Sequence, residues 1–473
     1  MADPLPRAAL DLASLPLVTL LGRRFAARGF PLFLIGGSVR SMLLGRDTGD
    51  LDFTTAARPE QIESLLEHMQ RQGDGPDALF AVGKKFGTIG AIFGGHTVEI
   101  TTFRSETYQP GSRKPEVEFG DSLRGDVSRR DFTINALAVD ATSGELFDFF
   151  GGLRDLDAEL VRAVGDAGSR FLEDPLRLLR AVRVATQLRF RIEPATLLAV
   201  KAHASHLTTI SRERIAAELN KLLVTEKVGD ALHTLCTLGL MEHILPEVLA
   251  LQGMRQDEYH HKDVYEHTLQ VVEGVPPQRA IRLGALLHDI AKPRTRSVDG
   301  GQVHFFGHER VGAQMARSML TRLHYDAETI ERVTRLVELH LRANAYEADW
   351  TDGAVRRFMR EAGEVLEELL QLSRADVTTS RPARKAAARR RVDELQARVE
   401  AIRAHEDVAL LKSPLDGNDL MTMFGRPPGP WIKKIKDPML ELVFDGALSP
   451  DDRETAAEIA RRIYRELFGE ADA

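Results

Sequence analysis

The character of the sequence changes near residue 155, and this change restricts the chain to few architectures. Before it, short apolar runs alternate with glycine turns and polar segments, a mixture that predicts both strands and helices. After it, the strand signals almost vanish, and helical periodicity continues to residue 473. The sequence therefore predicts an α+β head that is followed by a long, all-helical body.

Local signals place the elements of the head. The run "PLFLIGG" at 31–37 predicts a buried strand, and residues 88–103 predict a β-hairpin that turns at two glycines. Residues 104–122 are polar and rich in glycine and proline, so we expect a mobile loop there. Helices are expected at residues 1–30, 38–45 and 59–71.

Composition excludes several classes of protein. Hydrophobic residues make up 43% and charged residues 28% of the chain, as in ordinary soluble globular proteins. The single cysteine, Cys236, excludes a disulfide framework and a cysteine-rich zinc site, so we expect a reducing, cytoplasmic setting. The sequence predicts neither a signal peptide nor a membrane span. The net charge of −7 argues against nonspecific coating of nucleic acid, but it allows a local basic groove.

Two aspartates stand one residue apart in the predicted strand "DLDFTT". Because side chains alternate along a strand, Asp50 and Asp52 share one face, and Leu51 and Phe53 point into the core. Adjacent carboxylates repel, and each raises the pKa of the other unless a cation lies between them. Mg²⁺ prefers such oxygen ligands together with substrate phosphates, and two such ions can assist nucleotidyl transfer.

A Gly-Gly turn and an arginine precede these aspartates. At Gly36 and Gly37 the backbone can approach a triphosphate closely and offer N–H donors, and Arg40 can then reach a phosphate oxygen. Neither the turn nor the paired aspartates is specific alone, since most such pairs are surface strand ends. Their combination within about twenty residues on strand, turn, helix and strand favours a nucleotide site.

The segment "GGSVRSMLLGRDTGDLDFTT" resembles the signature of the class II tRNA nucleotidyltransferase and poly(A) polymerase family, which includes the CCA-adding enzymes. Four further motifs follow in the family's order, so the resemblance covers about residues 30–225. The family usually has an acidic residue where Ser41 stands, which leaves the role of that position open. The matching motifs are "VSRRDFTINALAVD", "FDFFGGLRDL", "EDPLRLLRAVR" and "SRERIAAEL".

The resemblance implies a polymerase-β-like head with Mg²⁺ on Asp50 and Asp52. It also implies nucleotide contacts from the glycine turn, Arg40, Arg130, Asp131 and Asn135. Glu99, on the predicted hairpin, is either a third acidic residue of this site or an exposed strand glutamate.

A base-reading helix is implied near residue 177. Asp174, Arg177, Arg180 and Arg183 recur every three residues, so on one helix they would follow one face. An aspartate accepts from the exocyclic amine that C and A share, and an arginine donates to ring acceptors, so this pair can select C or A without a template. The alternative is a surface ion pair, which would contribute well under about 1 kcal/mol.

Histidines and aspartates gather in the helical body. "ALLHDIAKP" places His288 and Asp289 together in an apolar helix, where a buried carboxylate is costly unless a positive group pairs with it. Imidazole and carboxylate ligands suit divalent metals. With their neighbours these residues resemble the HD phosphohydrolase superfamily, which implies a divalent metal that activates water against a phosphoester. The implied ligands are His267, His288, Asp289 and Asp376, with His308 and His340 as additional site histidines.

We therefore expect a template-independent tRNA nucleotidyltransferase that uses CTP and ATP, with tRNA as its partner and no protein partner required. Specialised siblings that add only A, only CC or poly(A) are alternatives. Another is a phosphohydrolase that uses the head to bind RNA. Some family members with HD domains hydrolyse 2′,3′-cyclic or 2′-phosphate RNA ends, so the body could clean ends before addition. The expected domains are a head at 1–155, a neck at 156–230, an HD domain at 231–394 and a tail at 395–473.

Basic segments outside these motifs have two interpretations each. The run from Arg381 to Arg391 predicts either a solvated helix face or an RNA phosphate contact. Lys433, Lys434 and Lys436 predict a tail helix that either packs against its domain or contacts the tRNA elbow. The polar loop at 104–118 is expected to help reposition the base-reading residues between C and A addition.

Overall fold

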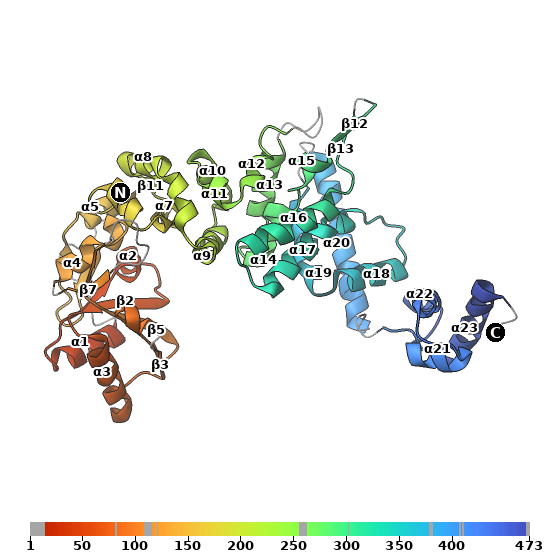
Figure 1. Cartoon of the computed structure of the whole chain (residues 1–473), viewed down its shortest axis with the longest axis horizontal. Helices are drawn as coiled ribbons and strands as arrows, with labels where there is room; N and C mark the ends of the chain where they lie inside the picture. Colours follow the sequence, from red (N-terminus) through yellow and green to blue (C-terminus); the bar gives the residue numbers. More distant parts are fainter. Residues whose placement is uncertain are drawn as a thin grey trace. The chain divides into compact units, whose positions relative to one another are not determined.

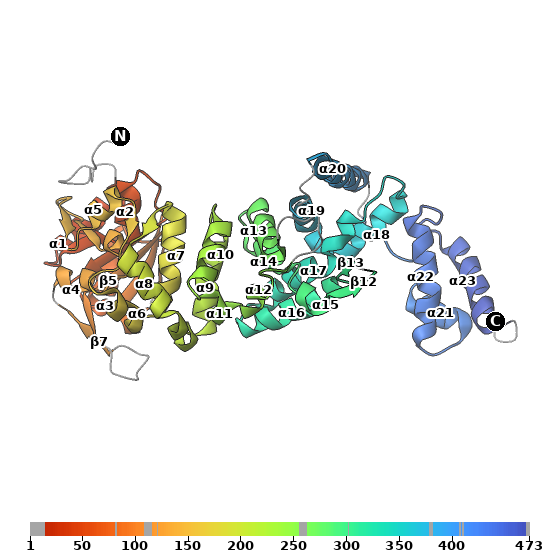
Figure 2. The same ribbon diagram turned by 90° about the horizontal axis from the view of Figure 1, so that it is seen from above.

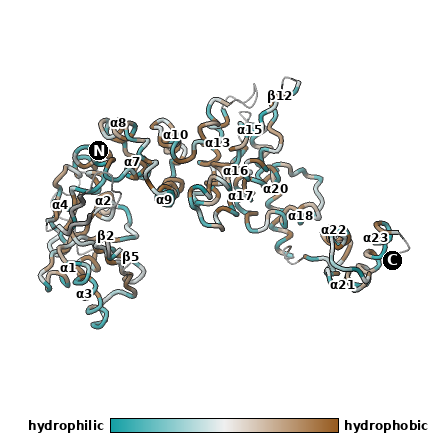
Figure 3. The backbone as a smooth tube through the Cα atoms, viewed as in Figure 1, coloured by the Kyte–Doolittle hydropathy of each residue, from teal (hydrophilic) through white to brown (hydrophobic). Residues whose placement is uncertain are grey.

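The computed structural model describes residues 15–80, 83–107, 116–120, 122–254, 263–300, 302–377, 382–405, 408 and 411–469. The chain divides into two compact units, Met1–Ile244 and Leu245–Ala473 (Figure 1). Figure 3 shows hydrophobic and hydrophilic stretches alternating along the helices of both units, as expected for helices with one buried face. Among the described residues, no helix is long and apolar enough to cross a bilayer.

A seven-stranded mixed sheet forms the core of the head. Its strand order is β3-β4-β5-β2-β1-β8-β9, and β2 runs parallel to β5 although its other neighbour, β1, is antiparallel. The strands are β1 (Leu32–Ile35), β2 (Asp50–Thr55), β3 (Ala78–Phe80), β4 (Thr88–Phe93), β5 (His96–Thr102), β8 (Leu137–Asp140) and β9 (Leu146–Asp148).

The three helices that were expected in the head are confirmed: α1 (Pro16–Ala26), α2 (Gly37–Leu43) and α3 (Pro59–Gln72). The first of them is shorter than predicted within the described residues, which begin at residue 15. The head also contains α4 (Leu123–Ser128) and α5 (Gly152–Asp157). The β4–β5 hairpin confirms the one that the sequence predicts at 88–103.

The predicted loop at 104–122 is partly wrong. Strands β6 (Arg104–Thr107) and β7 (Glu116–Phe119) pair antiparallel, with Arg104 opposite Phe119 and Thr107 opposite Glu116. Alternating residues such as "EVEF" can form a two-stranded ribbon despite their polarity, because both faces of such a ribbon tolerate water. Residues 108–115, at the centre of the predicted loop, lie outside the described residues.

Helices follow the head, as predicted. A short parallel pair, β10 (Leu160–Val161) with β11 (Arg191–Ile192), is an addition that the sequence signals missed. The helices that complete the first unit are α6 (Ala167–Glu173), α7 (Leu176–Leu188), α8 (Pro194–Ala202), α9 (Arg212–Leu223), α10 (Val228–Thr237) and α11 (Met241–Ile244).

The second unit is built almost entirely of helices (Figure 2). Its one described strand pair, β12 (Ser297–Asp299) with β13 (Gln302–His304), is a small antiparallel hairpin. The helices before the tail are α12 (Pro246–Leu249), α13 (Val264–Gly274), α14 (Arg279–Leu287), α15 (Lys292–Thr295), α16 (His308–Arg322), α17 (Ala327–Asn344), α18 (Asp352–Ala362), α19 (Leu366–Ala375) and α20 (Pro382–His405).

The tail has a small apolar core of its own. Helices α21 (Gly417–Phe424), α22 (Pro430–Phe444) and α23 (Arg453–Phe468) bury Trp431 and Tyr464. The rings of Phe424 and Tyr464 stack with centroids 4.0 Å apart. Of the basic residues noted above, Lys433 and Lys434 are exposed on α22, and Arg389 to Arg391 are exposed on α20.

Candidate functional site

The central strands of the head bring three carboxylates to one face of the sheet. Asp50 and Asp52 alternate along β2 with Leu51 and Phe53, which are buried. In the parallel register of β2 and β5, Asp52 lies opposite Glu99. Paired residues of a ladder point to the same face, so the strand pairing places Glu99 beside the two aspartates.

Burial and neighbouring charge both act on the pKa of Asp52 and Glu99. Burial raises the pKa of Asp52, and the charge of Asp50 raises it further, although Arg130 opposes the shift. Burial, Asp52 and Asp50 all raise the pKa of Glu99. Carboxylates that repel one another in this way are stabilised by a cation between them, and their oxygens are the ligands that Mg²⁺ prefers. The donor set therefore fits the magnesium that the sequence predicts.

Ser38 fixes the start of the strand that carries the aspartates. Its Oγ donates to the backbone oxygen of Asp50 at 3.0 Å and accepts from the backbone N–H of Asp52 at 3.3 Å. The side chain is buried in the first turn of α2. The sequence analysis assigned no role to this serine, and its place directly after the Gly-Gly pair is the signal that would have found it.

The Gly-Gly turn requires glycine for two reasons. Gly36 has φ +80°, a conformation that side chains disfavour. A Cβ atom on Gly36 would lie 2.6 Å from Nη1 of Arg130, so the missing side chain leaves room for that guanidinium. Burial lowers the pKa of Arg130, because its charge is poorly solvated there. The turn thus brings a half-buried cation next to bare backbone, which suits a phosphate group.

A chain of hydrogen bonds connects the predicted nucleotide residues. Arg40 donates through Nη1 to Oδ1 of Asn135, and Asn135 donates through Nδ2 to Oδ1 of Asp131 at 3.0 Å. Asp131 forms an ion pair with Arg180 of α7, with 2.6 Å between Oδ2 and Nη2. Burial lowers the pKa of Arg40 to about 10. Residues from α2, the turn before β8, and α7 therefore meet at one place.

Replacing Asp131 by asparagine is expected to destabilise the first unit. Burial alone would raise the pKa of Asp131, but Arg180 and Asn135 lower it from 3.8 to about 2. A lowered pKa stabilises the fold above pH 4, by about 2 kcal/mol, and that contribution is lost as the pH falls toward 2. Urea denaturation of wild type and Asp131→Asn should therefore differ most at pH 7, and the difference should shrink at pH 3. A difference that does not depend on pH would contradict the ion pair.

The expectation that Asp174 lies on the base-reading helix is wrong. Helix α6 ends at Glu173, Pro175 is the N-cap of α7, and Asp174 lies in the junction with φ −141° and ψ 95°. Proline disfavours helical backbone in the residue before it, which explains the break. Oδ1 of Asp174 accepts from the N–H of Leu176 at 3.2 Å, and Oδ2 accepts from Arg214 of α9 at 2.8 Å.

Arg177 is buried on the first turn of α7 and is not paired with Asp174. Its Nη1 donates to Glu173 at 2.9 Å and to the backbone oxygen of Arg170 at 3.0 Å, and Nη2 donates to the backbone oxygen of Arg129 at 2.7 Å. This arrangement argues against the surface ion pair that was the alternative. Further along α7, Arg183 pairs with Glu218 of α9 and so connects two neck helices.

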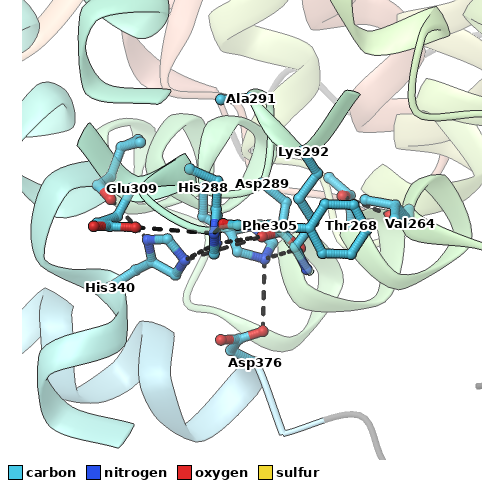
Figure 4. Close-up of polar contacts among 12 residues, drawn as sticks. Val264, Thr268, His288, Asp289, Ala291, Lys292, Phe305, Glu309, His340 and Asp376 are labelled. Atoms are coloured by element: carbon cyan, nitrogen blue, oxygen red, sulfur yellow. Dashed lines mark hydrogen bonds and ion pairs between the residues drawn. The ribbon is translucent and has the colours of Figure 1, made fainter. Parts of the chain in front are cut away.

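In the second unit, five helices and the residues that directly follow two of them bring six predicted residues together. His267 lies on α13, His288 and Asp289 directly follow α14, and Asp376 follows α19. The remaining two, His308 and His340, come from α16 and α17. Figure 4 shows His288, Asp289, His340 and Asp376 converging on one point.

The six side chains form two groups of three possible ligands: His267 with His288 and Asp376, and Asp289 with His308 and His340. Asp289 contacts both groups with different oxygens. Its Oδ2 lies 3.4 Å from Nε2 of His267 and 3.2 Å from Nε2 of His288. Its Oδ1 lies 3.4 Å from Nε2 of His308.

Backbone hydrogen bonds orient three of these imidazoles. In His288, His308 and His340, Nδ1 lies 2.7–2.8 Å from a backbone oxygen three residues earlier. A ring that donates through Nδ1 leaves the Nε2 lone pair for a metal, and such outer contacts are typical of metal-binding histidines. The donor set therefore fits divalent cations.

Charges in the cluster are strongly coupled. Burial opposes protonation of His288, but Asp289 and Asp376 raise its pKa to about 10, and the same contacts lower the pKa of both aspartates. Burial and the charge of His288 lower the pKa of His340 to about 4. The charged form of His288 is thus stabilised between the carboxylates of Asp289 and Asp376.

Two cluster residues escaped the sequence analysis. Nζ of Lys292 lies 2.7 Å from Oδ2 of Asp289, and Asn344 donates to Oδ2 of Asp376 at 3.1 Å. The lysine is part of "HDIAKP", three residues after Asp289, and this spacing could have predicted its contact with the aspartate.

Comparison with family models divides the chain into three matched segments. Residues 32–162 match the model described as "Poly A polymerase head domain", and residues 189–251 match "Probable RNA and SrmB- binding site of polymerase A". Residues 259–381 match "HD domain".

Relatives match over different shares of their length. The CCA-adding enzyme of Bacillus licheniformis is 41% identical over 236 residues, which are 50% of this chain and 56% of that protein. The A-adding tRNA nucleotidyltransferase of Deinococcus radiodurans is 31% identical over 85% of this chain and 89% of its own. The CC-adding tRNA nucleotidyltransferase of Thermus thermophilus is 31% identical over 92% of this chain and 94% of its own.

Among solved structures, the CCA-adding enzyme of Bacillus stearothermophilus in complex with CTP is similar over 99% of both chains. The TM-score is 0.70 and the sequence identity is 26%. The similarity in fold therefore extends beyond the head to the helical body.

Proposed function

Since the chain belongs to the tRNA nucleotidyltransferase and poly(A) polymerase family, we propose that it adds C and A from CTP and ATP to the 3′ end of tRNA and releases pyrophosphate. The observation that carries the proposal is the juxtaposition of Asp50, Asp52 and Glu99 on adjacent strands, near a glycine turn that a half-buried arginine, Arg130, approaches. The CTP complex of the Bacillus stearothermophilus enzyme supports the choice of nucleotide.

Residues of the head divide the work of nucleotidyl transfer. Asp50 and Asp52, with Glu99 beside them, would hold magnesium, which would supply positive charge for the attacking 3′-hydroxyl and the departing pyrophosphate. Ser38 holds the two aspartates in register by bonding to the backbone of both. Arg40 and Arg130 neutralise the triphosphate, and the open backbone at Gly36 and Gly37 allows its close approach.

Base selection is assigned to Asp174 and Arg177. Both are held by protein partners: Asp174 by Arg214, and Arg177 by Glu173. These contacts orient the two side chains, and to read a base they must exchange a partner for the nucleotide edge. A carboxylate and a guanidinium together match the amine and ring acceptor of C and A. Arg180 and Arg183 position α7 through Asp131 and Glu218.

Nucleotide order is tested with three tRNAs that end before CCA, after C and after CC, each incubated with a single labelled triphosphate. A complete CCA-adding enzyme is expected to extend the first two with CTP and the third with ATP. The relatives that match over most of this chain include an A-adding and a CC-adding enzyme. Each of these two activities would give its own pattern of extended tRNAs. Extension of the third tRNA alone would replace our proposal by A addition, and failure of that tRNA to accept ATP would replace it by CC addition.

We further propose that the cluster of the second unit is a phosphohydrolase centre for two divalent cations. Cations bound there would activate water for attack on a phosphoester. The supporting observation is Asp289, which faces one histidine group with each oxygen and so can bridge two ions. Lys292, released from Asp289 when that carboxylate binds metal, is placed to neutralise the phosphate.

The division into head, neck, HD domain and tail at residues 155, 230 and 394 is retained as a proposal. For the basic residues of α20 and α22, exposure supports contact with RNA phosphates, for which a free surface is required.

A further inference from the structure

Phe306, two residues before His308 of the histidine–aspartate cluster, has a ring that is exposed to solvent. Phe306 is 77% exposed, the largest exposed fraction among the large hydrophobic side chains of the described residues. It lies two residues after the end of the β12–β13 hairpin, where Val298 is also 58% exposed. Single exposed hydrophobic side chains are common on protein surfaces, so the neighbours of this ring, and not its exposure alone, indicate what it can bind.

Phe306 is part of a stacked pair. Its ring lies parallel to that of His304, with 5.0 Å between centroids and an interplanar angle of 10°. His304 is held in the hairpin by its pairing with Ser297. A planar ring that is supported on one side and exposed to solvent offers its other face to a further flat ring, and nucleobases stack on aromatic side chains in this way.

The stacked pair is connected to the cluster by a short, fixed segment. The backbone oxygen of Phe305 lies 2.8 Å from Nδ1 of His308, and Nζ of Lys292 lies 5.5 Å from the centre of the Phe305 ring. Figure 4 shows Phe305 beside Lys292 and Asp289. Gly307, with φ +75°, turns the chain into α16, so His308 is buried while Phe306 stays outside. Two residues span at most about 7 Å, which limits the distance between the backbones of Phe306 and His308.

We propose that Phe306, supported by His304, stacks on the nucleobase of a substrate whose phosphate is bound at the cluster. The hydrolytic centre would then select nucleotides and RNA 3′ ends over base-free phosphoesters. This inference rests on the proposed phosphohydrolase function of the same cluster. The charge of Lys292 and the flat ring of Phe306 match the two chemically different parts of a nucleotide, which a protein partner would not need to combine.

The test uses the full chain with Mn²⁺ and the variant Phe306→Trp, whose indole reports stacking by fluorescence. Adenosine monophosphate is expected to quench the new tryptophan at concentrations where ribose 5-phosphate does not, and inorganic phosphate should compete. The wild-type chain, with Trp350 and Trp431 only, gives the background. In the double variant with Asp289→Ala, quenching should require a far higher concentration because the phosphate anchor is lost.

A second measurement follows hydrolysis of adenosine 2′,3′-cyclic phosphate and of base-free glycerol 1,2-cyclic phosphate. Phe306→Ala is expected to raise KM for the first about tenfold and to leave the second unchanged, and Phe306→Trp should restore the lower KM. Val298→Ala, on the neighbouring β12–β13 hairpin, is the matched control and should leave KM for both substrates unchanged.

Each outcome decides between the possibilities. Equal effects of Phe306→Ala on both substrates would overturn base stacking and leave the hydrolytic function standing. Quenching that survives Asp289→Ala unchanged would overturn the claim that the stacked base belongs to a substrate whose phosphate is bound at the cluster. Absence of both phosphate binding and hydrolysis in the wild-type chain would overturn the proposed function and this inference with it. Intact hydrolysis without any quenching would indicate that Phe306 contacts a protein partner instead.

Discussion

Replacing Asp52 by asparagine is expected to lower CMP and AMP incorporation into tRNA by at least about a thousandfold, which corresponds to about 4 kcal/mol of transition-state stabilisation. The substitution keeps the size of the side chain but removes one of the negative charges that would hold magnesium. Asp52 is the central residue of the three, since it neighbours Asp50 along β2 and lies opposite Glu99 on β5. Incorporation of labelled nucleotide under single-turnover conditions measures the effect.

Asp47→Asn is the matched control for this substitution. Asp47 is an exposed aspartate shortly before β2, and its Oδ1 accepts from the N–H of Thr48, a contact that asparagine can keep. We expect its activity to stay within about twofold of wild type, as for surface substitutions generally. Should Asp52→Asn retain more than a tenth of wild-type activity, the assignment of these carboxylates would be wrong.

The same comparison separates the two proposed activities. Asp52→Asn is expected to leave hydrolysis by the second unit unchanged, because the two clusters share no residue. The Glu99→Gln variant then shows whether the third carboxylate participates. Glu99 is exposed on β5. A loss of activity similar to that of Asp52→Asn would place it among the metal ligands, and a change below about threefold would exclude it from them.

Replacing Asp289 by alanine is expected to abolish binding of both divalent cations in the second unit. Of the contacts described above, only those of Asp289 place one oxygen beside the histidines of each group: Oδ2 beside His267 and His288, and Oδ1 beside His308. By contrast, His267→Ala and His340→Ala each remove a ligand from one group, so each should retain one ion. Metal content after incubation with Mn²⁺ and gel filtration distinguishes these results, and phosphodiesterase activity should be lost in the Asp289 variant.

Stability alone would not distinguish a lost metal from a damaged core. Removing Asp289 also leaves buried Lys292 without its partner, which is costly in the absence of any metal. The useful quantity is therefore the increase in stability on adding Mn²⁺: about 4 kcal/mol for each ion that the wild-type cluster binds at a thousandfold excess over Kd, and none from this cluster in Asp289→Ala. His405→Ala, an exposed histidine of α20, is the control and should behave like wild type. Two bound ions in the Asp289 variant would refute the bridging role.

Local sequence determined much of this protein. Periodicity and turn residues predicted the change from a mixed head to a helical body, because helices and half-buried strands require apolar side chains at spacings that can be counted. Alternation along "DLDFTT" placed Asp50 and Asp52 on one face without any tertiary information. In the helical body, residue chemistry singled out His288 and Asp289, because a buried carboxylate is costly without a positive group, and the resemblance to the HD superfamily implied the other ligands.

Only the tertiary structure decided how these pieces meet. The placement of Glu99 beside Asp52 depends on a parallel pairing across a long crossover, and no local pattern encodes the register of strands so far apart. The helix break at Asp174 follows locally from Pro175, but the contact of its carboxylate with Arg214, 40 residues away, is decided by the tertiary structure. Asp289 can bridge two groups of ligands only because α13, α16, α17 and α19 pack around it, and such packing arises from the shape of the whole core.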